Sequence, residues 1–335
     1  MTEELNLREG KEIVDSIRKK SSDMFPHSLK EVFTKSLKQS LKVSWMLIKI
    51  YIPLSLLTIL LKQLGVIDYI APYFAPLMGA MGLPGEAALT LLIGFTVNIY
   101  AALATMSAFD LTFRQVTLLA VVVGIAHNLF VETGILTKVR MANIRIAFFR
   151  IFVAIPVGII LNLVLPENVA GTVLIRHAGA GGFSWLTTLQ GLLITSVQIM
   201  VIILLITLGY ELLIMWRYSS IIKRKVKFIP NAIGLSGKAF GPWIVGFIIG
   251  IAYSAGILYQ YMQKKELSHK DVCLTTVFIV LAHAIIEDTM LFVVMGGNFW
   301  WIILTRIFIA SMIVRILSLN NLYKKFLWIG LPKEK

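Results

Sequence analysis

The chain has 335 residues, of which 57% are hydrophobic and only 15% are charged, and its mean hydropathy is +0.81. Soluble domains carry about 25% charged residues, so this composition argues against a soluble enzyme and against a disordered chain. The net charge of +14 does not indicate a nucleic-acid partner, because the basic residues flank apolar runs, where they orient a chain in a bilayer. The sequence therefore predicts a polytopic protein of the cell (inner, cytoplasmic) membrane.

The predicted elements begin with residues 1–42, which are polar and are expected to form a cytoplasmic amphipathic lead-in. Eight apolar runs follow, each near or above the roughly 20 residues that a spanning helix needs: 43–63, 84–107, 114–137, 145–165, 185–213, 238–262, 271–295 and 299–320. Residues 65–82 contain Pro72 and Pro76 and are predicted to be an interfacial stretch that is too broken to cross. The runs are continuous and not alternating, which predicts an all-α fold.

The sequence contains an internal duplication. The offset between the copies is 152 residues in the first matching stretch and 156 in the later ones. Order and spacing persist over about 75 residues, which is the signature of a repeat. The matching stretches are GLPGEAALTLLIGF (82–95) with GLSGKAFGPWIVGF (234–247), AHNLFVET (126–133) with AHAIIEDT (282–289), and FRIFVA (149–154) with TRIFIA (305–310).

The placement of basic residues predicts how the two copies are oriented. Nine Lys and Arg lie in 1–42, six in the connection 217–238 and four after Tyr323. Positive-inside bias places these segments, and both termini, in the cytoplasm, with the loop 166–184 outside. Equivalent segments then point in opposite directions, so the copies are predicted to be inverted-topology repeats, as in many secondary transporters.

The same topology leaves three apolar segments between two external loops, so one of them must enter and leave by the same face. Assigning this role to 84–107, and to its copy 238–262, places every basic cluster inside. We therefore predict six spanning helices plus two re-entrant helical hairpins, which break within 94–98 and 246–250. Irregular backbone at membrane depth is tolerated only where it is buried in protein or lines a watery cavity. The alternative is that both segments are straight spanning helices.

The run LPGEAALTLLIGFTVNIYAALATM, followed by IAHNLFVET, resembles the nucleoside recognition (Gate) domain family. Relatives of that family include the membrane gate region of FeoB-type ferrous-iron permeases and the sporulation maturation membrane proteins. The resemblance implies a fold similar to concentrative nucleoside transporters. Asn98 and Ala101 match the permease pattern GxCNxPAxxAT, whereas Val97 and Tyr100 replace its cysteine and proline. The missing cysteine, and the lack of a GxxxxGK[ST] motif, argue against ferrous iron as the cargo.

This resemblance predicts a division of the chain into segments of different character. The segments are a lead-in (1–42), a first Gate-like repeat (43–165), an external loop (166–184), a second Gate-like repeat (185–320, with the basic connection 217–238) and a cytoplasmic tail (321–335).

Ionisable residues at membrane depth cost about 2.5–3.5 kcal/mol each on insertion scales, which makes them functional candidates. His127 and His283 occupy equivalent places in the middle of predicted helices, and Glu132 and Asp288 follow them by five positions. His283 and Glu287 have the i,i+4 spacing of one helix face, which can hold a cation or relay a proton. The alternative for each imidazole is a core histidine that is hydrogen-bonded to a neighbouring helix.

Two acid–arginine pairs repeat with the same separation. Glu132 and Arg150 are 18 residues apart, as are Asp288 and Arg306. The partners meet if the helices fold back near positions 141 and 297. They would then be either buried salt bridges that fix helix register or ion-coupling groups.

Uncharged polar groups complete the predicted substrate site. Asn98 lies beside the first proposed break, where helix termini present partial charges to a substrate, although its role is alternatively to satisfy the broken backbone. No catalytic residue, cofactor or resident metal is predicted. The predicted substrate-binding residues are Thr96, Asn98, His127, Asn128, Ser254, His283 and Glu287.

Three functions remain open from the sequence. The first is a secondary transporter that moves a small polar solute, nucleoside-like or a divalent cation, by alternating access. The second is an intramembrane metal enzyme, which would need clustered ligands with an open position, but neither HExxH nor GxSxG accompanies the histidines. The third is a membrane scaffold or signalling component, as in the sporulation relatives, with the lead-in docking on lipid or protein. A homo-oligomer is compatible with each function.

Overall fold

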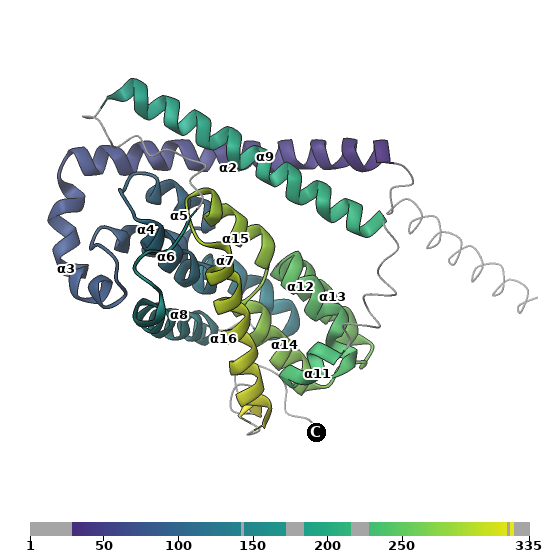
Figure 1. Ribbon diagram of the computed structural model, residues 1–335. Helices are drawn as coiled ribbons and strands as arrows, with labels where there is room; N and C mark the ends of the chain where they lie inside the picture. Colours follow the sequence, from purple (N-terminus) through teal and green to yellow (C-terminus); the bar gives the residue numbers. More distant parts are fainter. Residues whose placement is uncertain (1–28, 142–143, 172–183, 216–227, 320–321, 325–335) are drawn as a thin grey trace, which may run out of the picture. The chain divides into compact units, whose positions relative to one another are not determined.

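The computed structural model describes residues 29–141, 144–171, 184–215, 228–319 and 322–324. Within these residues the regular structure is entirely helical, as the sequence predicts, and Figure 1 shows the helices in chain order by colour. The chain is a multi-pass membrane protein, because six of its described helical stretches are long and apolar enough to cross a bilayer. They are Leu29–Gln63, Phe113–Ile135, Ile144–Val164, Trp185–Gly209, His269–Val294 and Phe299–Leu319.

The chain forms two compact units. The smaller unit includes the start of helix α2 (Leu29–Gln63), as far as Ser44, and the end of α9 (Trp185–Met215), from Met200 onward. The larger unit contains the rest of both helices and all of the duplicated sequence. Every candidate site residue therefore belongs to the larger unit.

Several predicted segments lie partly or wholly outside the described residues. They are most of the lead-in (1–42), most of the external loop (166–184), the basic part of the connection (217–238) and the tail (321–335). Helix α2 runs without interruption through the predicted boundary between the lead-in and the first apolar run.

The larger unit contains the same order of helices twice (Figure 1). The first copy consists of α4 (Ala87–Thr96), α5 (Ile99–Met106), α6 (Phe113–Ala126), α7 (Leu129–Ile135), the 3-10 turn η1 (Leu136–Val139) and α8 (Ile144–Val164). The second consists of α12 (Phe240–Ile248), α13 (Ile251–Gln263), α14 (His269–Leu281), α15 (Ile285–Val294) and α16 (Phe299–Leu319), after the short α11 (Phe228–Ile233) and η2 (Gly237–Ala239). The duplication in the sequence thus extends to the order of the helices.

Each copy contains two short helices that pack against each other across a sharp break, and we call α4 with α5 the first hairpin and α12 with α13 the second. Helices α4 and α5 separate at Asn98, which is extended (φ −174°) and whose Oδ1 accepts a hydrogen bond of 2.8 Å from the amide of Ala101. This is the N-cap of α5. Helices α12 and α13 separate at Gly250, whose φ of 127° is readily adopted only by glycine. Both breaks fall inside the predicted intervals, 94–98 and 246–250.

The second copy has four more residues than the first, and they lengthen a helix. Helix α5 ends at Met106, whose equivalent at an offset of 152 is Leu258, but α13 continues to Gln263. The extra residues therefore form an additional helical turn. The difference therefore lies between the equivalents of Met106 and Gln115, the interval in which the offset of the repeat changes from 152 to 156.

The spans predicted at 114–137 and 271–295 are not continuous helices, which corrects the prediction for both. Helices α6 and α7 are separated at Asn128, which has a left-handed backbone (φ 51°), and α14 and α15 are separated at Ala284 (φ 43°). Left-handed conformations cost about 1–2 kcal/mol in residues other than glycine. Contacts with the hairpins offset that cost, as described below.

Residues 65–82 are less broken than predicted. They contain a helix, α3 (Val66–Ala80), which includes both Pro72 and Pro76. The prediction that these prolines interrupt the segment is wrong. At 15 residues, α3 is still shorter than the roughly 20 that a perpendicular crossing needs.

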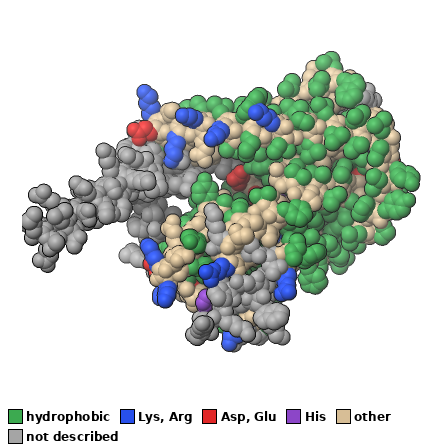
Figure 2. Space-filling view, turned by 180° about the vertical axis from the view of Figure 1, so that it is seen from behind, with side chains coloured by type: hydrophobic (Ala, Val, Ile, Leu, Met, Phe, Trp, Pro, Cys, Tyr) green, Lys and Arg blue, Asp and Glu red, His purple; other side chains and the backbone are tan. Residues whose placement is uncertain are grey.

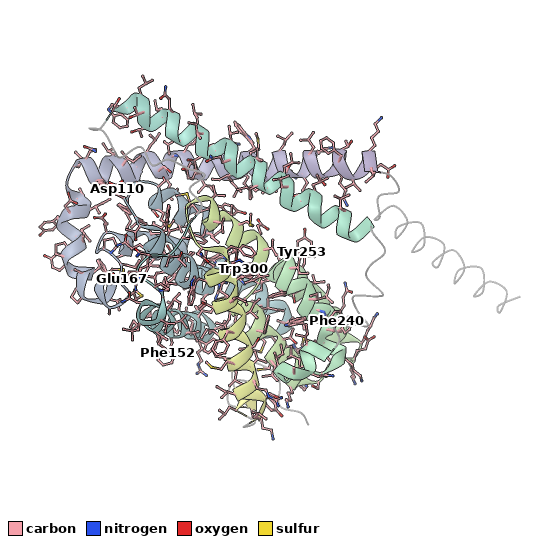
Figure 3. The ribbon with its side chains drawn as sticks, viewed as in Figure 1. Asp110, Phe152, Glu167, Phe240, Tyr253 and Trp300 are labelled. Carbon is pink, nitrogen blue, oxygen red and sulfur yellow. The ribbon has the colours of Figure 1, made fainter. Side chains whose placement is uncertain are left out.

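Large apolar side chains are exposed on the helices of the larger unit. Phe152 on α8 is 77% exposed and Trp300 on α16 is 65% exposed, and both are labelled in Figure 3. Figure 2 shows hydrophobic side chains spread over much of the visible surface. Apolar surface on this scale is a liability in water, whereas lipid tails solvate it.

Candidate functional site

Two helix breaks bring a histidine from each copy into contact. His127 directly follows α6, and His283 lies between α14 and α15. The centroids of their rings are 4.9 Å apart, although the residues are 156 positions apart in the sequence. Both side chains are buried. The equivalent histidines of the two copies therefore meet at one point.

Each of these breaks is held by the hairpin of its own copy. The amide of Asn128 donates to the carbonyl oxygen of Gly94 (2.9 Å), and the amide of Ala284 donates to that of Gly246 (3.2 Å). A β-carbon on Gly246 would lie 2.9 Å from Cβ of Ser254, so glycine at this position allows α12 and α13 to approach each other closely. The hairpin carbonyls thus supply partners for backbone amides at the breaks, which offsets the cost of the left-handed residues.

Glu132 on α7 joins the two imidazoles. Its Oε1 lies 3.2 Å from Nε2 of His127 and 3.0 Å from Nε2 of His283. Its Oε2 accepts a hydrogen bond of 2.6 Å from Nη1 of Arg150 on α8. A single buried carboxylate therefore links both copies and a guanidinium group. We call these four residues, with Asp288 and Arg306, the imidazole cluster.

Asp288 on α15 is the equivalent of Glu132, but it is used differently. Its Oδ2 accepts a hydrogen bond of 3.1 Å from Nη2 of Arg306 on α16, and the same Nη2 donates to the carbonyl oxygen of His283 (3.0 Å). Nε2 of His127 lies 4.0 Å from this Oδ2. Both predicted acid–arginine pairs are thus in contact. Glu132 is within hydrogen-bond distance of both imidazole rings, whereas Asp288 is not within that distance of His127.

The two arginines are almost completely buried, with about 1% of each exposed. Nε of Arg150 donates to the carbonyl oxygen of Ile125 at 2.8 Å. Among the described residues of the site, Nη2 of Arg150, Nε and Nη1 of Arg306 and Oδ1 of Asn128 have no hydrogen-bond partner. An unpaired buried polar atom is costly, so these four atoms are places where a further polar group would be stabilised.

A second contact joins the first hairpin to the other copy. The hydroxyl of Tyr100 on α5 donates to Oε1 of Glu287 on α15 at 2.7 Å. The prediction that His283 and Glu287 share one helix face is wrong, because the break at Ala284 separates them. His283 contacts Glu132, whereas Glu287 contacts the hairpin. Sequence reasoning missed the role of Tyr100, for which the replaced permease proline was the only signal.

The other predicted substrate-binding residues occupy different surroundings. Thr96 and Asn98 lie half-buried at the tip of the first hairpin, where Oγ1 of Thr96 donates to the carbonyl oxygen of Leu92 (2.7 Å). Ser254 is fully buried and donates to the carbonyl oxygen of Pro242 (2.8 Å). That hydrogen bond joins α13 to α12, so Ser254 contributes to the packing of these two helices against each other.

The donor spacing of the cluster also resembles that of a metal site. One donor atom each from His127, His283 and Asp288 lie within 4.8 Å of one another. However, the carboxylates of Glu132 and Asp288 already pair with guanidinium groups. A divalent ion would therefore add charge that these pairs do not compensate, which is expensive in a buried site. The spacing fits a metal ion, but the charges fit it poorly.

Comparisons with known proteins agree with the resemblance noted in the sequence. The family described as nucleoside recognition (Gate) matches residues 44–145, the region that carries the resemblance. Over 314 residues the chain is 29% identical to the uncharacterized membrane protein YvoD of Bacillus subtilis (strain 168), covering 91% of this chain and 99% of that relative. No solved structure matches the chain significantly.

Proposed function

We propose that this Gate-domain membrane protein is a secondary transporter, which moves a small polar solute by alternating access between two inverted repeats. The observation that carries the proposal is the contact of His283 with Glu132, which joins a helix break of one copy to a half-helix of the other. Secondary transporters built from inverted repeats place their sites where broken helices of the two repeats meet. The re-entrant hairpins would form the rest of that site.

The basic residues support opposite orientations for the copies. Arg140 and Arg145 follow the half-helix α7, whereas the equivalent turn 296–298 in the second copy is uncharged. Conversely, Lys264 and Lys265 follow the second hairpin, whereas the equivalent turn 107–112 carries only an aspartate. Positive-inside bias puts the basic member of each pair in the cytoplasm and its equivalent outside.

The charges of the imidazole cluster favour an uncharged, nucleoside-like solute over a divalent cation. Both carboxylates at its centre are already paired. The unpaired atoms of Arg150, Arg306 and Asn128 are three donors and one acceptor, which suits a solute with both carbonyl and amino or hydroxyl groups. The amide of Asn98 at the hairpin tip adds a further polar group.

The test is uptake into proteoliposomes of a panel of nucleosides and divalent cations, with and without a proton or sodium gradient. We expect gradient-dependent uptake of at least one nucleoside, reduced about tenfold by Asn98→Ser, because losing one good hydrogen bond costs about 1.4 kcal/mol. Serine keeps the N-cap of α5, so Asn98→Ser should leave thermal stability nearly unchanged. The control is Gln260→Ala, at an exposed polar position on α13.

Flat uptake for every member of the panel would contradict transport and favour the scaffold function. Uptake of divalent cations alone would retain transport but overturn the choice of solute.

A further inference from the structure

The two imidazoles each use one nitrogen as a hydrogen-bond donor. Nδ1 of His127 lies 3.1 Å from the carbonyl oxygen of Val123, and Nδ1 of His283 lies 2.9 Å from that of Ile279. A carbonyl oxygen can only accept, so both Nδ1 atoms carry a hydrogen. In a neutral ring the other nitrogen, Nε2, is then a bare acceptor.

Both Nε2 atoms face the same carboxylate oxygen, Oε1 of Glu132, at 3.2 and 3.0 Å. An ionised carboxylate oxygen is also an acceptor without a hydrogen. If both rings were neutral and Glu132 were ionised, the two Nε2 atoms and Oε1 would all be acceptors. Each Nε2 would then lie at hydrogen-bond distance from Oε1 with no hydrogen between them. The junction requires at least one hydrogen beyond those of the neutral rings.

The charges that surround this junction indicate how many protons it holds. Two carboxylate–guanidinium pairs lie at it, Glu132 (α7) with Arg150 (α8) and Asp288 (α15) with Arg306 (α16), and a third carboxylate, Glu287, directly precedes Asp288 on α15. The remaining titratable neighbour is Tyr100 on α5, which donates to Glu287. With neutral rings, the imidazole cluster and Glu287 together have one net negative charge. One added proton brings it to zero, whereas a divalent ion would leave one positive charge in a buried site, which is costly.

We propose that the cluster binds one excess proton, which His127, His283 and Glu132 share. His283 comes from the second copy, whereas His127 and Glu132 come from the first. A change in the arrangement of the copies that separates His283 from Glu132 therefore removes one of the two Nε2–Oε1 contacts between which the proton is shared. The proton then leaves Nε2 for solvent, and the ring becomes neutral. This proton is the coupling ion of transport, an assignment that rests on the proposed function.

The test is nitrogen-15 NMR of the full-length protein in lipid bilayers at neutral pH, with the histidines labelled. Replacing His27, His177 and His269 by glutamine leaves only the two rings of the cluster. We expect one imidazolium per protein, either on one ring or averaged over both. Two neutral rings, each with a bare Nε2, would overturn the proposal, as would one equivalent of bound transition metal in place of the imidazolium, measured by mass spectrometry.

Two variants separate proton binding from packing and from transport. Glu132→Gln is expected to abolish the imidazolium, because the glutamine oxygen can accept from Arg150 while its amide donates to a bare Nε2. Asn98→Ser is expected to keep the imidazolium while its uptake falls about tenfold. If Glu132→Gln does not fold, the labelled parent protein still decides the question. An imidazolium in a protein without uptake would support the proton site and contradict transport. Proton-independent uptake with two neutral rings would support transport and contradict the proton site.

Discussion

Arg150→Met is expected to destabilise the protein by about 3–5 kcal/mol, the cost of leaving a buried charge without its partner. Nη1 of Arg150 bonds Glu132 at 2.6 Å, and its Nε bonds the backbone of α6 at the carbonyl of Ile125. Methionine fills similar volume but makes neither bond. The measurement is the free energy of unfolding in mixed micelles, followed by circular dichroism as denaturing detergent is added.

The double variant Arg150→Met with Glu132→Gln is expected to recover a large part of this loss, because it removes the unpaired carboxylate as well. A control is Arg315→Met, at an exposed arginine on α16, which should change stability by less than about 0.5 kcal/mol. If the double variant were no more stable than Arg150→Met alone, the ion pair would not be what orders α7 against α8.

Ala284→Val is expected to cost about 2 kcal/mol or more, because β-branched residues are strongly disfavoured at positive φ. Ala284 has φ 43°, and its amide bonds the carbonyl of Gly246. Ala284→Gly should not be destabilising, because glycine adopts this conformation without strain. Thermal unfolding of the purified protein measures both effects.

The opposite responses to glycine and valine distinguish backbone strain from packing, since glycine removes contacts at this buried site. Ala252→Val, at an exposed position within α13, controls for the helix propensity of valine and should have little effect. A loss of stability in Ala284→Gly as large as that in Ala284→Val would mean that the break is not maintained by the left-handed residue.

Much of the fold could be predicted because local signals coincide with the repeat. Positive φ at Gly250 and the N-cap at Asn98 mark the hairpin breaks, and both residue types are visible in the sequence. The common separation of 18 residues also predicts the pairing of Arg150 with Glu132, which the structure contains. These features depend on spacing along one copy, which the sequence records directly.

The half-helix breaks could not be predicted, because their cause is a tertiary contact. Alanine is a good helix former, so nothing in the residue type of Ala284 indicates a break. Its left-handed backbone accompanies the hydrogen bond from its amide to the carbonyl of Gly246. The meeting of His283 with Glu132 and the bond between Tyr100 and Glu287 each join the two copies. No periodicity within one copy contains that information.

The most direct test of the account is the side of the membrane on which equivalent turns of the two copies lie. With Cys273, the only cysteine, replaced by alanine, single cysteines are placed at Asp110 (labelled in Figure 3) or at Glu266, which are exposed in the turns after the first and second hairpins. A membrane-impermeant thiol reagent is then applied to right-side-out and to inside-out vesicles. Inverted repeats predict that Asp110→Cys reacts only from outside and Glu266→Cys only from inside. Labelling of both cysteines from the same side would contradict the account.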